Sequence, residues 1–355
     1  MKKLLPILLL LCLLGGCHSA REGAAAAPET SAPPISAAPT ATAAPASTPA
    51  PTQAPRATAP AIPAPTSSPA LTPAPTAAPA PVETPFTIVW MADTQNLPRD
   101  NPEVFFSMRD WILENREKEN IQFVIHSGDV VDGQTTGMKA NAEAALVPLF
   151  EALPGMIVSG NHDIPRSGSH WYFVQSPYAQ LIRKEGQTYG EEDACYVTFR
   201  AGGTDFLVFG IGFGISCPGW MRQVIARHSD HVVIAVLHAG LQENGDIQGP
   251  MKTILERVAP DAPGLRLMVC GHMRGTATRV DWFDDDNDGE KERSVTSMMF
   301  NFQEDRVDGL GFMRLLRFDP ATRSIEVETY SPRFDKWGYP HATEEENHFL
   351  LENAW

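Results

Sequence analysis

Short apolar runs and amphipathic stretches alternate along most of this 355-residue chain. Apolar runs of four to seven residues are typical of buried strands, and apolar residues at three- to four-residue spacing indicate helices. The predicted strands are residues 86–92, 123–127, 156–159, 196–199, 206–211, 232–237 and 265–269, and the predicted helices are residues 102–118, 140–153, 219–227 and 250–258. This alternation favours an α/β fold.

The pattern changes towards the C-terminus, where strand follows strand. The predicted strands of this region are residues 276–282, 295–302, 311–318 and 324–330. A first half of strands and helices, followed by a run of strands, predicts two sheets with helices outside them.

Residues 18–85 show neither pattern. They consist almost entirely of Ala, Pro, Thr and Ser, and hold 17 of the 31 prolines. Such a segment has too few large apolar side chains for a core, and its prolines favour extended polyproline conformations. We interpret it as a semi-rigid tether; a protein-binding proline-rich tract is the alternative. Residues 86–355 are then predicted to form one large domain.

The first 17 residues have the features of a secretory signal. Lys2 and Lys3 precede an apolar run at residues 4–14, which is too short to span a bilayer. The run leads into Leu-Gly-Gly-Cys at residues 14–17, which resembles the cleavage box of bacterial lipoproteins. That resemblance implies that Cys17 is lipidated and anchors an exported protein to a bacterial membrane. An ordinary cleaved signal is the alternative.

Three cysteines remain after removal of Cys12 and lipidation of Cys17: Cys195, Cys217 and Cys270. Export permits a disulfide, and a Cys195–Cys217 pair is one option. The odd count and the lack of framework spacing favour buried free thiols instead.

The charge of the chain is strongly acidic. Its net charge is −15, from 28 basic and 43 acidic residues. Residues 1–85 hold four basic and three acidic residues, which leaves 24 against 40, or −16, for residues 86–355. Nucleic-acid binding needs a basic surface, so nucleic acid is not expected as a partner. A small phosphorylated substrate stays possible, because bound metal cations reverse the local field.

Polar residues that suit a metal ion follow five of the predicted strands. They are Asp93-Thr94-Gln95, the segment Gly128-Asp129-Val130-Val131-Asp132, the segment Gly160-Asn161-His162-Asp163, His238, and Gly271-His272. The carboxyl ends of strands in an α/β sheet converge on one crevice. Each motif alone has a simpler interpretation as a cap, a turn or a hydrogen-bonded histidine. Five in the same structural position favour a shared site.

The order of these motifs resembles that of the calcineurin-like metallophosphoesterase family: Asp-x-His, Gly-Asp-x-x-Asp/Asn, Gly-Asn-His-Glu/Asp, a lone His, and Gly-His-x-His. The resemblance covers about residues 86–330, and the Gly-Asp and Gly-Asn-His-Asp motifs are its most specific parts. It implies a four-layer α/β/β/α sandwich, in which helices flank two central mixed sheets. It also implies a crevice that holds two metal ions.

The resemblance also implies roles for individual residues. Asp129 would bridge the two metals; Asn161, His238 and His272 would complete one site, and Asp93 and Gln95 would belong to the other. Carboxylate and imidazole ligands suit one or two ions of Fe, Mn or Zn. A metal-activated water would attack phosphorus directly.

Two further roles concern the substrate. By the resemblance, His162 would protonate the leaving oxygen or stabilise charge on it, with Asp132 orienting its imidazole. Asn161 would touch a phosphoryl oxygen while it binds metal.

The sequence departs from the family pattern at two positions of the same metal site. Gln95 and Arg274 stand where the family usually has histidines, although Asp-Thr-Gln also occurs in exported members, so Gln95 has the alternative interpretation of a tolerated variant. Glutamine offers a weaker, neutral amide oxygen, and arginine stays protonated and cannot ligate. Arg274 either replaces the charge of the second metal and clamps a phosphoryl oxygen, or points away from a loosely held metal. We favour the first.

The sequence thus predicts hydrolysis of a phosphomonoester or phosphodiester, in a phosphorylated small molecule or surface polymer. One alternative is a catalytically impaired protein that binds phosphate-bearing polymers through a thinned metal site, and another is an adhesin-like role for the tether. His162 and Asp132 favour the enzyme, because a binding protein needs no acid for a leaving group.

Three weaker signals have simpler interpretations. Residues 284–289 open like a calcium loop, but position twelve is Val295, so an acidic hairpin turn is favoured. Residues 301–303 line the crevice or cap a strand. Trp171 and Tyr172 form a substrate wall or simply pack, and His170 is unassigned.

Overall fold

The computed structural model describes residues 83–185, 187–303 and 311–355. The signal segment with Cys17 and nearly all of the predicted tether lie outside these residues, so the predictions for them stay predictions. Within the described ranges, no helix is long and apolar enough to cross a membrane.

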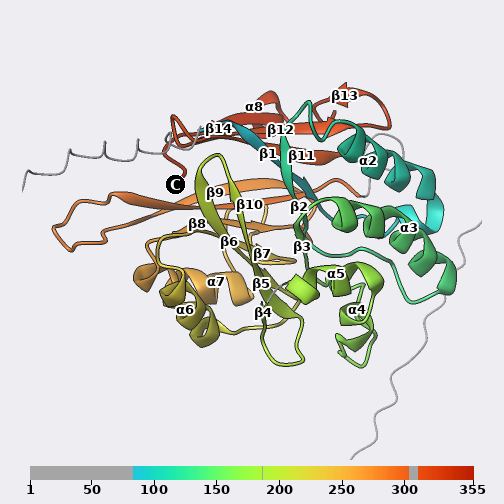
Figure 1. Cartoon of the computed structure of the whole chain (residues 1–355), viewed down its shortest axis with the longest axis horizontal. Helices are drawn as coiled ribbons and strands as arrows, with labels where there is room; N and C mark the ends of the chain where they lie inside the picture. Colours follow the sequence, from blue (N-terminus) through green and yellow to red (C-terminus); the bar gives the residue numbers. More distant parts are fainter. Residues whose placement is uncertain (1–82, 186, 304–310) are drawn as a thin grey trace, which may run out of the picture. The chain divides into compact units, whose positions relative to one another are not determined.

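The strands of the described residues form two seven-stranded sheets (Figure 1). The first sheet has the order β13-β12-β11-β1-β2-β3, and β14 also pairs with β12. Its strands are β1 (Phe86–Met91), β2 (Ile121–His126), β3 (Gly155–Ile157), β11 (Met313–Asp319), β12 (Ser324–Ser331), β13 (Lys336–Trp337) and β14 (His348–Leu351). β1, β2 and β3 are parallel, whereas β11 is antiparallel to β1.

The second sheet has the order β4-β5-β6-β7-β8-β10-β9. Its strands are β4 (Gln187–Thr188), β5 (Ala194–Ala201), β6 (Thr204–Ile211), β7 (Val232–Leu237), β8 (Leu265–Cys270), β9 (Gly275–Phe283) and β10 (Arg293–Asn301). β6, β7, β8 and β10 are parallel neighbours, and β4, β5 and β9 are antiparallel to their neighbours. Both sheets are therefore mixed.

Helices cover the outer face of each sheet. They are α1 (Leu97–Asp100), α2 (Pro102–Glu114), α3 (Thr136–Ala152), α4 (Trp171–Val174), α5 (Pro177–Glu185), α6 (Pro218–Arg227), α7 (Gly249–Arg257), the 3₁₀ turn η1 (Ala259–Asp261) and α8 (Glu344–Asn347). α2 and α3 share a core with the first sheet, and α6 and α7 share one with the second. Figure 1 shows these helix pairs on opposite outer sides of the sheets.

Alternation along the strands of the second sheet separates the two cores. On β6, Phe206 and Val208 face the core shared with the first sheet, whereas Leu207 and Phe209 face α6 and α7. Side chains of a strand point alternately to opposite faces, so a continuous apolar run is buried on both. The two mixed sheets with flanking helices confirm the predicted α/β fold.

Two hairpins lie in the second sheet. β5 and β6 pair from Ala194↔Ile211 to Ala201↔Thr204, around a turn that contains Gly202 and Gly203. β9 and β10 pair from Gly275↔Asn301 to Phe283↔Arg293, so residues 284–292 form the turn of a hairpin, as favoured from the sequence. Three of its aspartates and Glu292 bring ligand atoms within 4.8 Å of one another.

Some local predictions differ from the structure. The helix predicted at residues 102–118 ends at Glu114, and Asn120 has a left-handed φ of 46° before β2 begins. α5 was not predicted, and neither were α1, α4, α8, β4, β13 and β14, each of two to four residues. Cys195, Cys217 and Cys270 are free and buried, as favoured from the sequence.

Candidate metal centre

The predicted site residues lie where strands of the two sheets end, and hydrogen bonds join these ends both between the sheets and within the second sheet. Asp93 and Asp129 follow β1 and β2 of the first sheet; His238 and His272 follow β7 and β8 of the second. The Nδ1 of His238 lies 2.9 Å from the carbonyl oxygen of Ser127, after β2. The N–H of Gly271 donates to the carbonyl of His238 at 2.9 Å.

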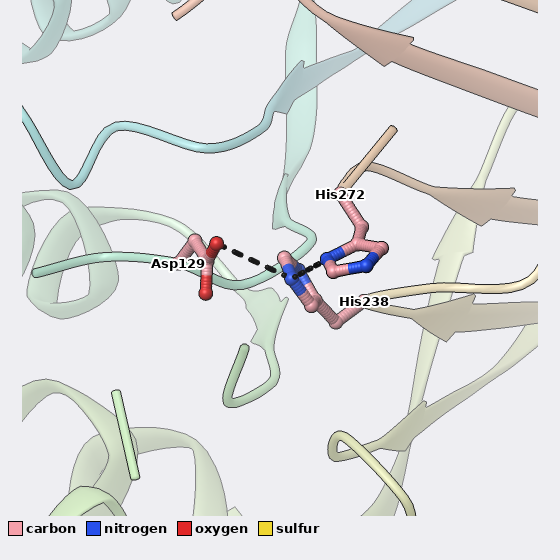
Figure 2. Close-up of side chains that lie close together, drawn as sticks. All are labelled: Asp129, His238 and His272. Atoms are coloured by element: carbon pink, nitrogen blue, oxygen red, sulfur yellow. Dashed lines mark hydrogen bonds and ion pairs between the residues drawn. The ribbon is translucent and has the colours of Figure 1, made fainter. Parts of the chain in front are cut away.

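Three candidate ligands converge on one nitrogen. The Nε2 of His238 lies 3.4 Å from Asp129 Oδ2, 3.1 Å from His272 Nδ1 and 3.0 Å from Asn161 Oδ1. Figure 2 shows Asp129, His238 and His272 directed toward one another from separate segments. Their ligand atoms all lie within 4.8 Å of one another, so these side chains can surround one ion.

The backbone of this region adopts an uncommon conformation at three candidate ligands. Asp93, Asp129 and His272 have φ values of 51°, 52° and 70°. Left-handed residues other than glycine are infrequent, and each costs on the order of 1–3 kcal/mol. Such conformations cluster at functional sites, because surrounding structure must hold them in place. Three of the eight described non-glycine residues with positive φ are thus candidate ligands at these strand ends.

Two motif glycines leave room for these carboxylates. A Cβ on Gly160 would lie 2.1 Å from Asp129 Oδ1, and one on Gly271 would lie 1.9 Å from Asp93 Oδ2. Both distances are far below van der Waals contact, so any larger residue would displace a candidate ligand. The Gly-Asn and Gly-His motifs therefore require glycine at these positions for steric reasons.

Asp163 links the Gly-Asp and Gly-Asn-His motifs by hydrogen bonds. Its buried carboxylate accepts hydrogen bonds from the backbone N–H groups of Val130, Val131 and Gly160, at 2.8–3.1 Å. Burial raises the pKa of this carboxyl to about 7, although the three N–H donors partly oppose the rise. The sequence placed Asp163 in a motif but assigned it no role; it fixes the backbone beside Asp129 and Asn161.

The Asp129–His238 pair dominates the electrostatics of the cluster. Burial alone would lower the pKa of His238, but the hydrogen bond and charge of Asp129 raise it to about 9. Burial and the neighbouring His238 lower the pKa of His272. The Nδ1 contact with Ser127 leaves Nε2 of His238 facing the cluster, which is the arrangement that a metal-binding histidine needs.

His162 and Asp132 lie beside the cluster and contact each other. The Nδ1 of His162 lies 2.7 Å from Asp132 Oδ1, and the other oxygen of Asp132 accepts from Arg99. The backbone N–H of His162 donates to Asp129 Oδ1 at 2.9 Å. The His162 side chain is 42% exposed, so a substrate can reach it. Arg99, on α1, carried no recognisable signal in the sequence.

The other predicted residues form a different arrangement. Both oxygens of Asp93 accept from the backbone N–H of His272 at 3.0 Å. Gln95 Nε2 donates to Asp129 Oδ2 at 3.2 Å, and its Oε1 is buried without a hydrogen-bond partner. An unpaired buried acceptor beside a carboxylate fits a cation at this position. Arg274 is exposed, one residue before β9.

The remaining candidates lie around the site. Asn301 Nδ2 donates to the carbonyl of His272 at 3.1 Å, so the end of β10 supports the last motif. Trp171 and Tyr172 are 60% and 49% exposed and contact each other edge to face. His170 Nδ1 lies 2.9 Å from Ser159 Oγ.

The chain is similar in sequence to one protein family and to one curated protein. The family model described as calcineurin-like phosphoesterase matches residues 86–273. An uncharacterized protein, YvnB, of Bacillus subtilis strain 168 is 30% identical over 260 residues, or 71% of this chain. The alignment covers 20% of YvnB, so the chain spans about a fifth of the length of this curated relative.

Two solved structures are also similar. One is GAP50, the anchor in the inner membrane complex of Plasmodium, with 10% identity and a TM-score of 0.45 over 76% of this chain and 88% of that one. The other is TT1561 of Thermus thermophilus, with 14% identity and a TM-score of 0.45 over 70% of this chain and all of that one. The family model spans more than half of the chain and includes the Asp129, Asn161, His238 and His272 motifs, so this chain belongs to the calcineurin-like phosphoesterase family.

Proposed function

We propose that this chain hydrolyses a phosphomonoester or phosphodiester by a metal-activated water, on the outer side of a bacterial membrane. The observation that carries the proposal is the convergence of Asp129, Asn161 and His272 on His238 Nε2, next to the His162–Asp132 pair. Metal-dependent phosphoester hydrolysis is the activity that the family suggests.

The residues present suit a metal ion. Asp129, Asn161, His238 and His272 would hold one ion, of Fe, Mn or Zn, by carboxylate, amide and imidazole groups. Asp93 and Gln95 would hold a second one more weakly. When bound, the metal would lower the pKa of a water and polarise a phosphoryl oxygen.

His162 is the proposed acid for the leaving oxygen. Its Nδ1 is engaged by Asp132, so a protonated ring presents its second N–H, at Nε2, to the substrate. The Asp132 carboxylate stabilises that cationic ring and fixes its orientation. Arg99 contacts the far oxygen of Asp132 and thereby holds the pair in place.

A second candidate function is binding without turnover. Gln95 and Arg274 stand at positions where the family has histidines, which weakens one of the two metal sites. A protein with such a site could bind phosphate-bearing polymers and not cleave them. The His162–Asp132 contact favours hydrolysis, because binding alone needs no proton donor.

The proposed location rests on the N-terminal sequence. Cys17 follows the small residues of a lipoprotein-like cleavage box, and residues 18–85 provide a tether. Replacing Cys17 by Ala is expected to release the protein from the membrane fraction of cells. Unchanged membrane association of that variant would contradict lipid anchoring.

The hydrolytic proposal is tested with an aryl phosphate and its bis-aryl ester, each assayed with Mn, Fe or Zn. His162→Ala is expected to lower the rate about 10²- to 10⁴-fold, the usual contribution of a positioned acid, with unchanged metal content. His231→Ala is the matched control, because this histidine also contacts an aspartate, Asp230, and precedes β7, whereas His238 follows that strand. Equal rates for His162→Ala and the wild type would remove the catalytic role.

A further inference from the structure

An open pocket of about 350 Å³ adjoins the metal cluster on the side of the second sheet. It is lined by the ends of β6 and β7, the start of α7 and the segment after β8. His238 and His272 belong both to this pocket and to the cluster, so the pocket opens directly onto the proposed reaction site. Pockets that bind small molecules begin at roughly this size.

The lining of the pocket is uncharged apart from those two imidazoles. Phe213, Leu237, Pro250 and Met273 form apolar walls, and Gln242 and Gln248 contribute neutral amides. No Asp, Glu, Lys or Arg lines it among the described residues. Away from the two imidazoles, a charged group would lose hydration and gain no opposite charge from the lining, whereas an apolar group would gain burial.

Phe213 links the pocket to the cluster. Its ring centre lies 5.8 Å from the ring centres of both His238 and His272. An aromatic group of a ligand that enters beside these imidazoles therefore meets the Phe213 ring within the range of favourable ring contacts.

The backbone that carries Phe213 is held firmly. The N–H of Phe213 donates to the carbonyl of Ser159 at 3.0 Å, and the N–H of Gly212 donates to the carbonyl of Asp193 at 2.7 Å. The Asp193 side chain in turn accepts from the N–H of Ser159 at 2.8 Å. The backbone at Gly212 and Phe213 is thus fixed to the segment that leads into the Gly-Asn-His motif. Ligand binding therefore costs little ordering of this backbone.

Residues 240–248 form a loop that also borders the pocket, and hydrogen bonds within the loop hold it in place. The N–H of Gln248 donates to the carbonyl of Gly240 at 2.8 Å, and Leu241 and Ile247 form an isolated antiparallel bridge. The loop that carries Gln242 and Gln248 is therefore a stable border of the pocket.

We propose that this pocket binds the organic group of the phosphoester substrate, and that this group is an uncharged aromatic or heteroaromatic ring system. The inference rests on the proposed function for the position of the phosphoryl group at the cluster. A cavity of about 150 Å³ holds one benzene ring, so one or two fused rings fit the space beside Phe213. Gln242 and Gln248 also line the pocket, and an amide can donate to a ring heteroatom or accept from a ring N–H.

Binding is tested first, because it does not require hydrolysis. Calorimetry compares naphthylmethylphosphonate with methylphosphonate on the protein as purified with its metal. The wild type is expected to bind the naphthyl compound at least about 10-fold more tightly, as apolar pockets discriminate by this order. Equal affinities for the two phosphonates would overturn the proposal.

Substitution of Phe213 tests whether the preference for the naphthyl compound arises in this pocket. Phe213→Ala is expected to reduce the preference to less than about threefold, and Phe213→Leu, which keeps an apolar side chain, to an intermediate value. Phe334→Ala is the control, because this exposed phenylalanine lies outside the pocket. Circular dichroism identifies a variant that fails to fold. A full preference in folded Phe213→Leu and Phe213→Ala would place the ring elsewhere and contradict the proposal.

Hydrolysis then separates this inference from the proposed function. In Phe213→Ala, kcat/KM is expected to fall about 10-fold or more for naphthyl phosphate and less than about twofold for glycerol phosphate. An equal fall in kcat/KM for both esters would refute the proposed binding role of the pocket, but would not contradict the proposed hydrolytic function. A naphthyl preference in binding, without hydrolysis of any ester, would support the pocket and refute the proposed activity.

Discussion

The two sides of the strand-end cluster share a backbone design but differ in their side chains. Asp93, Asp129 and His272 all have a left-handed backbone, so the fold prepares both sides alike. On one side, Asp129, Asn161 and His272 meet at His238 Nε2. On the other side, Asp93 accepts from a backbone N–H and Gln95 offers a single unpaired amide oxygen. The two sides therefore differ in the groups that their side chains offer to a metal ion.

Removing one residue from each side gives the largest expected contrast. His238→Ala should weaken metal affinity by more than about 100-fold and abolish hydrolysis, since loss of a mere outer-shell partner already costs about 10- to 100-fold. Gln95→Ala should weaken metal affinity by less than about tenfold. The measurement is metal affinity by calorimetry, with His238→Gln as a variant of similar polarity. Equal losses for Gln95→Ala and His238→Ala would remove the asymmetry.

Restoring the family pattern should reduce the contrast. The double variant Gln95→His, Arg274→His supplies two imidazoles in place of an amide and a cation, and imidazole suits Fe, Mn and Zn better. We expect the affinity for a second ion to rise about 10- to 100-fold. Metal titration of the double variant checks this. No gain in second-ion binding would show that the framework, and not these side chains, limits that site.

The pH dependence of metal binding should reflect the protonation of His238, on the side of the cluster that is expected to bind metal more tightly. The proton on His238 must leave before Nε2 binds metal, and Asp129 raises the pKa of this histidine to about 9 in the metal-free protein. Below that pKa, apparent affinity should therefore rise by up to about tenfold per pH unit as pH increases, and level off above it. Calorimetry in buffers of different ionisation enthalpy measures the released proton. Binding without proton release at pH 7 would contradict this assignment.

The sequence predicted the part of the site that follows from local pattern. Apolar strands ending in Asp129, Asn161, His238 or His272 are visible as strings of residues, and parallel strands bring such ends together. The contacts that arrange these residues are distant in the chain and were not predictable. Ser127 and His238 are 111 residues apart, and Arg99 and Asp132 are 33 apart.

Two further features needed the three-dimensional structure. Phe213 carries no motif, and only the packing of β6 beside β7 brings its ring next to His238 and His272. The left-handed backbone at Asp93 is equally invisible, because aspartate adopts it only when its surroundings require it. Local patterns thus predicted which residues gather, and long-range packing determined how they are oriented.

The number of ions that the protein retains tests the asymmetric metal centre most directly. Purified protein, dialysed against metal-free buffer, is analysed by inductively coupled plasma mass spectrometry, with His238→Ala beside it. We expect about one Fe, Mn or Zn ion per wild-type chain and none in the variant, because one side of the cluster holds metal far more tightly than the other. Two tightly retained ions per wild-type chain, or equal metal in His238→Ala, would contradict this description of the site.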